Sequence, residues 1–95
     1  MPKFVILGNW TEQGIKNVRE TTKRAQAAKE AAAKRGGKID IWWTMGRYDI
    51  VGVLDMPTSE AALSFLVALG MQGNIETETL PAWDASTVDE VLKTV

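Results

Sequence analysis

The chain contains no cysteine and no histidine. Without thiols there can be no disulfide framework, no zinc site built on cysteine and no thiol nucleophile. Without imidazoles the chain lacks the commonest general base and the usual protein ligand of zinc, copper and haem iron. Any metal would have to be held by oxygen ligands, which favours magnesium, calcium or manganese, and no spacing of acidic residues demands one. We therefore expect no metal and no cofactor.

Long apolar runs and a strong charge of one sign are missing as well. The apolar stretch at residues 4–7 is too short for a signal peptide or a membrane span, and the stretch at residues 61–69 is interrupted by Ser64. A formal net charge of −1 argues against a polyanion as the partner of the whole molecule. These features predict a soluble cytoplasmic protein that binds neither membrane nor nucleic acid.

The length of 95 residues is enough for one domain and not for two, so we expect a single domain over residues 1–95. With 45% hydrophobic and 24% charged residues the composition is that of a soluble globular protein. Four tryptophans are unusual in so short a chain, because a small two-layer domain has few places to bury large aromatic side chains.

The periodicity of apolar residues predicts the order β-α-β-β-α-β with one extra helix. Strands are expected at residues 3–8, 38–45, 48–55 and 74–80. Helices are expected from Thr11 to the glycines at 36 and 37, from Thr58 to Gly70, and from Ser86 to the end. Gly46 and Arg47 would form the hairpin turn between the second and third strands.

Right-handed crossovers then place the four strands in one antiparallel sheet with both long helices on one face. The predicted fold is therefore α+β, a ferredoxin-like βαββαβ sandwich with a short C-terminal helix.

The face of this sheet without helices is expected to be apolar as well. Large side chains fall on both parities of the second and third strands: Ile39, Ile41, Trp43 and Tyr48 on one, and Trp42, Val51 and Val53 on the other. Several such side chains exposed on a flat sheet would promote aggregation. We therefore predict that the protein associates with itself, sheet against sheet, as a homodimer or higher oligomer. Alternatively, Trp42 lies on the surface or under the terminal helix.

Three separated segments carry a family resemblance. They are Gly46-Arg47-Tyr48-Asp49 with its flanking strands, residues 9–14, and residues 68–80. Over about residues 2–83 the chain resembles the GYD-domain family, a group of small, mainly bacterial proteins. The resemblance implies a ferredoxin-like fold of the dimeric α+β barrel type, and it marks Gly46, Tyr48 and Asp49 as the family motif. It carries over no catalytic residue.

A candidate pocket can be placed around this motif. Its residues are Asn9, Trp10, Trp43, Arg47, Tyr48 and Asp49. Because Tyr48 and Asp49 are neighbours on a strand, their side chains should point to opposite faces. One of the two would line a cavity between sheet and helices, with Arg47 at its mouth. In the alternative, Asp49 caps amide groups of the turn and the Tyr48 hydroxyl lies at the rim.

Charged residues form two further groups. Glu76 and Glu78 share one face of the fourth strand, where they could bind a cation or transfer protons, or simply form a solvated edge with salt bridges. Eight of the eleven lysines and arginines lie between residues 16 and 38. This pattern is typical of a solvated helix with i,i+4 ion pairs, and Glu20–Arg24 and Glu30–Lys34 have that spacing.

The leading functional hypothesis is a homo-oligomeric small-molecule-binding or regulatory protein without catalysis of its own. The alternative is a cofactor-less enzyme similar to the small monooxygenases and isomerases of the dimeric α+β barrel type. It would use a cavity within one monomer, and its candidate residues are Asn9, Trp10, Trp43, Arg47 and Tyr48. A third possibility is a structural assembly unit.

Overall fold

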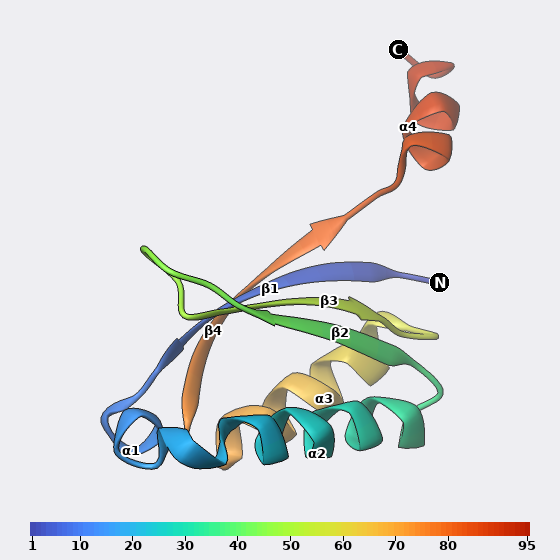
Figure 1. Cartoon of the computed structure of the whole chain (residues 1–95). Helices are drawn as coiled ribbons and strands as arrows, with labels where there is room; N and C mark the ends of the chain where they lie inside the picture. Colours follow the sequence, from blue (N-terminus) through green and yellow to red (C-terminus); the bar gives the residue numbers. More distant parts are fainter.

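The computed structural model describes all residues, 1–95, and has an α+β fold built on one sheet. Its strands are β1 (Lys3–Trp10), β2 (Lys38–Trp43), β3 (Ile50–Asp55) and β4 (Ile75–Ala82). Its helices are α1 (Glu12–Lys16), α2 (Thr21–Lys34), α3 (Ser59–Met71) and α4 (Ala85–Leu92), with a 3-10 turn at Val18–Glu20. The strand order is β2-β3-β1-β4 and all neighbours are antiparallel (Figure 1). The predicted four-stranded antiparallel sheet is confirmed.

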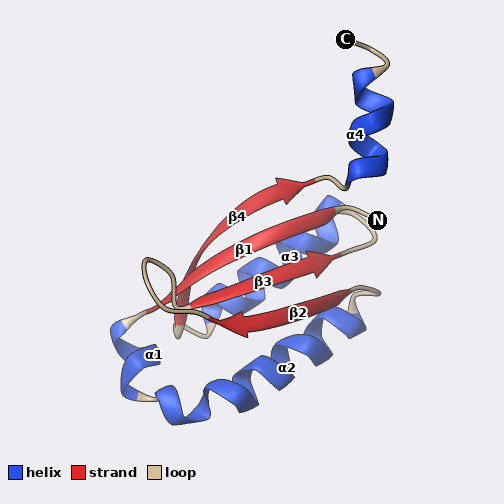
Figure 2. Ribbon diagram, turned by 45° about the horizontal axis from the view of Figure 1, so that its top comes forward, coloured by secondary structure: helices blue, strands red, loops and turns tan.

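Helices α2 and α3 lie on the same face of the sheet (Figure 1, Figure 2). On α3 the side chain of Thr58 accepts a hydrogen bond from the Ala61 amide, as expected for a hydroxyl cap. On α2 the residues that pack on the core include Ala28, Ala31 and Ala32, whose small side chains allow a close approach to the sheet. The core between the layers consists of Ile6, Ala32, Ile39, Leu54, Met56, Ala62 and Phe65.

The opposite face of the sheet, here called the open face, is covered by no helix. Directly paired residues of antiparallel strands point to the same side, and the register places Leu7 opposite Val51 and Val51 opposite Trp42. The Trp42 side chain is 54% exposed. The prediction that apolar side chains occupy both faces is confirmed for Trp42, Val51 and Val53, and Trp42 lies on the surface.

The first predicted helix is wrong as a single element. It is divided into α1, the 3-10 turn and α2, with a bend at Asn17. The reason is a contact across the fold: a Cβ atom placed on Gly14 would lie 1.9 Å from the carbonyl oxygen of Asn74. This approach, which only glycine allows, fixes α1 against the segment before β4, while α2 must run along the sheet.

The hairpin between β2 and β3 is also longer than predicted. The strands end at Trp43 and begin at Ile50, so residues 44–49 form a loop and Tyr48 belongs to no strand. The amide of Thr44 donates to the Asp49 carbonyl at 2.8 Å and closes this loop. Gly46, with φ of 109°, provides a turn in a backbone region that favours glycine.

Two boundaries near the C-terminus differ from expectation. Strand β4 continues through Pro81 to Ala82, which is possible because β4 lies at the edge of the sheet. The N-cap of α4 is Asp84 rather than Ser86, and its side chain accepts a hydrogen bond from the Thr87 amide.

Helix α4 stands away from the rest of the molecule beyond the end of β4 (Figure 1, Figure 2). The radius of gyration is 14.4 Å, whereas a compact domain of this length should have about 12 Å. Val88, Val91 and Leu92 of α4 are all exposed. Their three- and four-residue spacing gives the helix one apolar side, which is exposed in the monomer.

We expect α4 to lose helix content on acidification. The backbone amide of Thr87, followed by the side chains of Thr87 and Ser86, donates to Asp84 and holds the pKa of that carboxyl below its ordinary value. A depressed carboxyl pKa stabilises the folded helix above the unfolded pKa of about 3.9, and this contribution is lost as the pH falls through the folded pKa. The ¹³Cα shifts of residues 85–92 would report the change. Asp84→Asn keeps the acceptor and should remove the pH dependence, while unchanged shifts in Asp84→Ala at neutral pH would contradict the assigned cap.

Candidate functional site

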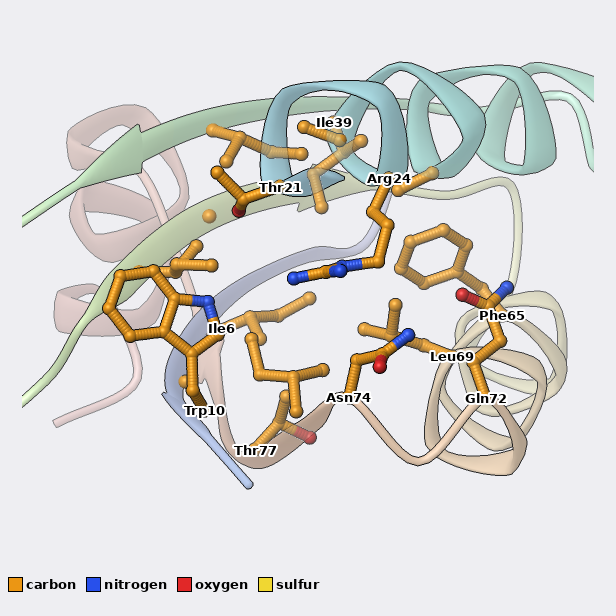
Figure 3. Close-up of a pocket in the computed structure, with 17 residues that line it drawn as sticks. Ile6, Trp10, Thr21, Arg24, Ile39, Phe65, Leu69, Gln72, Asn74 and Thr77 are labelled. Atoms are coloured by element: carbon orange, nitrogen blue, oxygen red, sulfur yellow. The ribbon is translucent and has the colours of Figure 1, made fainter. Parts of the chain in front are cut away.

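A cavity of about 70 Å³ lies between the sheet and helices α2 and α3 (Figure 3). Its walls are mainly aliphatic and aromatic side chains from both layers. Ile6, Ile41, Ile50, Ile75, Phe65 and Leu69 form most of this surface. Concave apolar spaces with a few polar groups are typical of small-molecule sites.

One polar atom in the wall of the cavity has no partner. The indole Nε1–H of Trp10 is fully buried and makes no hydrogen bond. An indole nitrogen can only donate, and leaving a buried donor unsatisfied costs about 1–3 kcal/mol. Trp10 is the last residue of β1, and Figure 3 shows its nitrogen directed into the cavity.

The cation of Arg24 reaches the same space from α2. Its Nη1 donates to the carbonyl of Asn17 at 2.8 Å, and its Nη2 approaches the carbonyl of Gly14 at 3.4 Å. The expected ion pair with Glu20 is wrong, because Glu20 pairs with Lys23 instead, at 3.4 Å. No carboxylate lies within ion-pair distance of Arg24. The predicted Glu30–Lys34 pair does not form either.

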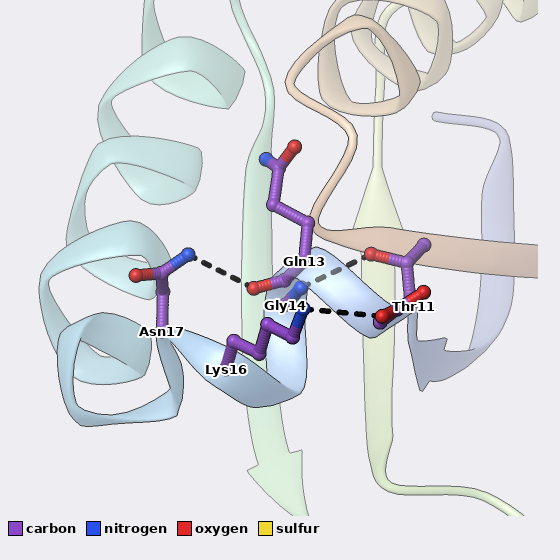
Figure 4. Close-up of polar contacts among 6 residues, drawn as sticks. Thr11, Gln13, Gly14, Lys16 and Asn17 are labelled. Carbon is purple, nitrogen blue, oxygen red and sulfur yellow. Dashed lines mark hydrogen bonds and ion pairs between the residues drawn. The ribbon is translucent and has the colours of Figure 1, made fainter.

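Polar contacts within α1 (Figure 4) and from α1 to the segment before β4 fix this helix in place. The hydroxyl of Thr11 accepts from the Gly14 amide at 3.1 Å and donates to the Gly73 carbonyl at 2.6 Å. Gln13 Nε2 donates to the carbonyl of Gln72 and to Asn74 Oδ1. The two carbonyls that hold Arg24 are therefore themselves anchored to the turn before β4.

A second, more open cleft of about 240 Å³ lies on the open face, beneath the loop at residues 44–49. The Tyr48 hydroxyl lies 3.4 Å from Glu78 Oε1. The guanidinium of Arg47 lies 5.6 Å from the centre of the Tyr48 ring, a distance typical of a cation–π contact. Glu76 and Asn9 also line this cleft, so the two glutamates do share a face as predicted.

The structure divides the six candidate pocket residues among different places. Only Trp10 lines the cavity between sheet and helices. Trp43 lies at the end of β2 and donates its indole N–H to Thr21 Oγ1 at 3.0 Å. Asn9, Arg47 and Tyr48 lie together on the open face instead. Asp49 accepts a hydrogen bond from the Trp10 amide, so it caps the end of β1 rather than amides of its own turn.

The main residue that the sequence interpretation missed is Arg24. A signal was present, since Thr21, Arg24 and Ala28 follow one another at three- and four-residue steps and so share a face of α2. That face carries the alanines that pack on the sheet. An arginine on the same face indicates a polar site between the helix and the sheet. No group of three acidic side chains comes close enough together to hold a metal ion.

Comparison with known proteins gives a family and a fold. The family model described as GYD domain matches residues 4–92. The crystal structure of TTHA0845 from Thermus thermophilus is similar, with a TM-score of 0.57 and 24% sequence identity, over 90% of this chain and 96% of that one. No match was found among curated proteins. None of the helices has both the length and the apolar character needed to cross a membrane.

Proposed function

The chain belongs to the GYD domain family, and from this membership and the geometry of its cavity we propose that it is a homo-oligomeric small-molecule-binding or regulatory protein. Its monomer would have the ferredoxin-like arrangement, and two monomers would associate as a dimeric α+β barrel. The observation that carries the binding proposal is the buried, unpartnered indole N–H of Trp10, directed into an apolar cavity. A bound molecule with a hydrogen-bond acceptor would satisfy it.

The aromatic and polar candidates support binding more than catalysis in this cavity. Of the five side chains considered for a cofactor-less reaction, only Trp10 lines it. The other four, Asn9, Trp43, Arg47 and Tyr48, are divided between the open face and the end of β2. No nucleophile and base therefore meet there.

The amount of exposed surface supports self-association. The accessible area of the monomer is 6384 Å², whereas a folded monomer of 10.4 kDa should expose about 5,400 Å². The excess of about 1,000 Å² is close to the roughly 800 Å² that each partner buries in a standard interface. The open face offers the apolar patch for such a contact, with Val5, Leu7, Val51, Val53 and Leu80 grouped on its central strands and β4.

Helix α4 supports the same proposal. Its eight residues are too few for a stable isolated helix, and its apolar side is exposed in the monomer. Because α4 extends beyond the sheet edge, a second copy placed against the open face would be within its reach (Figure 2). We assign a second copy of this chain as its partner.

Ligand binding is tested by thermal unfolding with a broad panel of small metabolites. A ligand at 100 times its Kd should stabilise the protein by about 2.7 kcal/mol, which for a domain of this size raises Tm by about 10–20 °C. Ala25 lines the cavity, so Ala25→Leu should fill the space and abolish the shift.

The matched control is Ala27→Leu, since Ala27 lies two residues further along α2 and is exposed. This variant should keep the full ligand-induced shift. A panel that moves Tm of no variant, or an Ala25→Leu protein that responds as the parent does, would count against a ligand in this cavity.

A further inference from the structure

Two hydrogen-bond donors, the indole N–H of Trp10 and the guanidinium of Arg24, belong to residues that line the cavity. Figure 3 shows the guanidinium of Arg24 extending toward the side of the indole ring that carries Nε1 of Trp10. Both groups only donate, so neither can satisfy the other. The indole N–H of Trp10 therefore has no acceptor in the monomer.

Of the other polar side chains around the cavity, two accept hydrogen bonds within the protein, whereas those of Gln72 and Thr77 make none. Thr21 Oγ1 accepts from the Trp43 indole at 3.0 Å. Asn74 Oδ1 accepts from Gln13 Nε2 at 2.8 Å. The Gly14 and Asn17 carbonyls accept from Arg24 itself. None of these acceptors bonds to the indole N–H of Trp10.

The charge of Arg24 indicates what kind of acceptor fits. A guanidinium has five N–H donors and stays protonated at all relevant pH values. Two of its nitrogens contact neutral carbonyls, and no carboxylate of the chain lies within ion-pair distance. A carboxylate placed between Arg24 and Trp10 would receive charge-assisted hydrogen bonds, which are the stronger kind.

The rest of the wall indicates the body of the ligand. Apart from the polar groups described, the cavity presents isoleucine, leucine and phenylalanine side chains. A hydrocarbon chain or small ring buried there gains from leaving water. The volume of about 70 Å³ leaves room for a small molecule only.

We propose that the cavity binds a small apolar monocarboxylic acid as its anion, with the carboxylate held between Trp10 Nε1–H and the Arg24 guanidinium and the hydrocarbon body among the aliphatic side chains. This inference rests on the proposed function and names its ligand class. The proposal predicts that, among molecules of the same shape, the anion binds more tightly than the neutral or cationic molecule.

The test uses three probes of matched shape, 3-methylbutanoate, 3-methylbutan-1-ol and 3-methylbutan-1-amine, added to the ¹⁵N-labelled full chain. The indole resonance of Trp10 is identified by its loss in Trp10→Phe. The carboxylate should move this resonance downfield and saturably, and should bind at least about tenfold more tightly than the alcohol, as expected for a hydrogen bond to a charged group. The amine should not bind.

Variants separate the charge from the fold. Arg24→Gln should weaken the carboxylate at least about tenfold while leaving the alcohol nearly unchanged. Arg24→Lys, which keeps the charge, should recover part of the affinity. The matched control is Arg19→Gln, because Arg19 is a neighbouring exposed arginine that does not line the cavity. It should bind the carboxylate as the parent does.

Three outcomes would overturn the inference, and they have different consequences. If the alcohol binds as tightly as the carboxylate, and Ala25→Leu abolishes both, the carboxylate assignment fails and the proposed binding function stands. If none of the three probes moves the Trp10 resonance while other small molecules raise Tm through the cavity, the ligand class is wrong. If the probes leave the Trp10 resonance unchanged and no molecule of the panel raises Tm, the proposed binding function is wrong as well.

Discussion

Val51→Lys is expected to convert the proposed dimer into monomers. Val51 lies on the open face between Leu7 and Trp42, so in a two-fold interface both copies of the substituted residue would be buried. Burying one such side chain contributes about 1.5–3 kcal/mol, and two copies therefore raise the Kd of the dimer about 100-fold or more. Light scattering coupled to size exclusion, at several micromolar concentrations, measures the change.

The monomer should tolerate this substitution, because in it the lysine can extend into water from an uncovered face. The matched control is Val67→Lys on α3, where the valine is already 54% exposed on the side away from the sheet. That variant should keep the mass of the parent. A parent protein that remains at 10.4 kDa when concentrated would remove the interface altogether.

Phe65→Ala should produce the largest loss of stability. The Phe65 side chain is 1% exposed and lies between α3 and the sheet, where it contributes to both the core and the cavity wall. Truncating a buried phenylalanine costs about 3–5 kcal/mol, a large part of the 5–15 kcal/mol typical of a domain. Tm should fall by about 10–40 °C, which calorimetry or circular dichroism would record.

A neighbouring position gives the control for that change. Leu63 lies two residues earlier on the same helix and is 62% exposed, so Leu63→Ala should alter the free energy of unfolding by no more than about 0.5 kcal/mol. Equal melting temperatures for the two variants would mean that α3 does not pack on the sheet through Phe65.

The features that the sequence predicted well are those set by local chemistry. The cap at Thr58 and the spacing of Ala62 and Phe65 define α3 without reference to any other element. Similarly, the alternation of side chains along β2 places Trp42 on the face opposite Ile41 whichever partner the strand has. Such features can be predicted from sequence because they depend on residues only a few positions apart.

The features that it missed depend on contacts between distant segments. The bend at Asn17 follows from the approach of Gly14 to Asn74, sixty residues apart, which no local pattern reveals. The position of Tyr48 depends on how the loop at residues 44–49 leaves the sheet. The i,i+4 spacing predicts an ion pair between Glu20 and Arg24 from one helix alone. In the structure the guanidinium of Arg24 donates instead to the carbonyls of Gly14 and Asn17.

Strand β1 connects the two surfaces of this protein through a single layer of backbone. Ile6, Gly8 and Trp10 face the cavity, while Leu7 and Asn9 between them face the other side. A shift of this strand that suits a bound molecule is therefore transmitted to the surface proposed to meet a second copy. By thermodynamic reciprocity, any factor by which association alters affinity for the small molecule is the factor by which that molecule alters association. Binding in the cavity would then control association of the chains through this one strand.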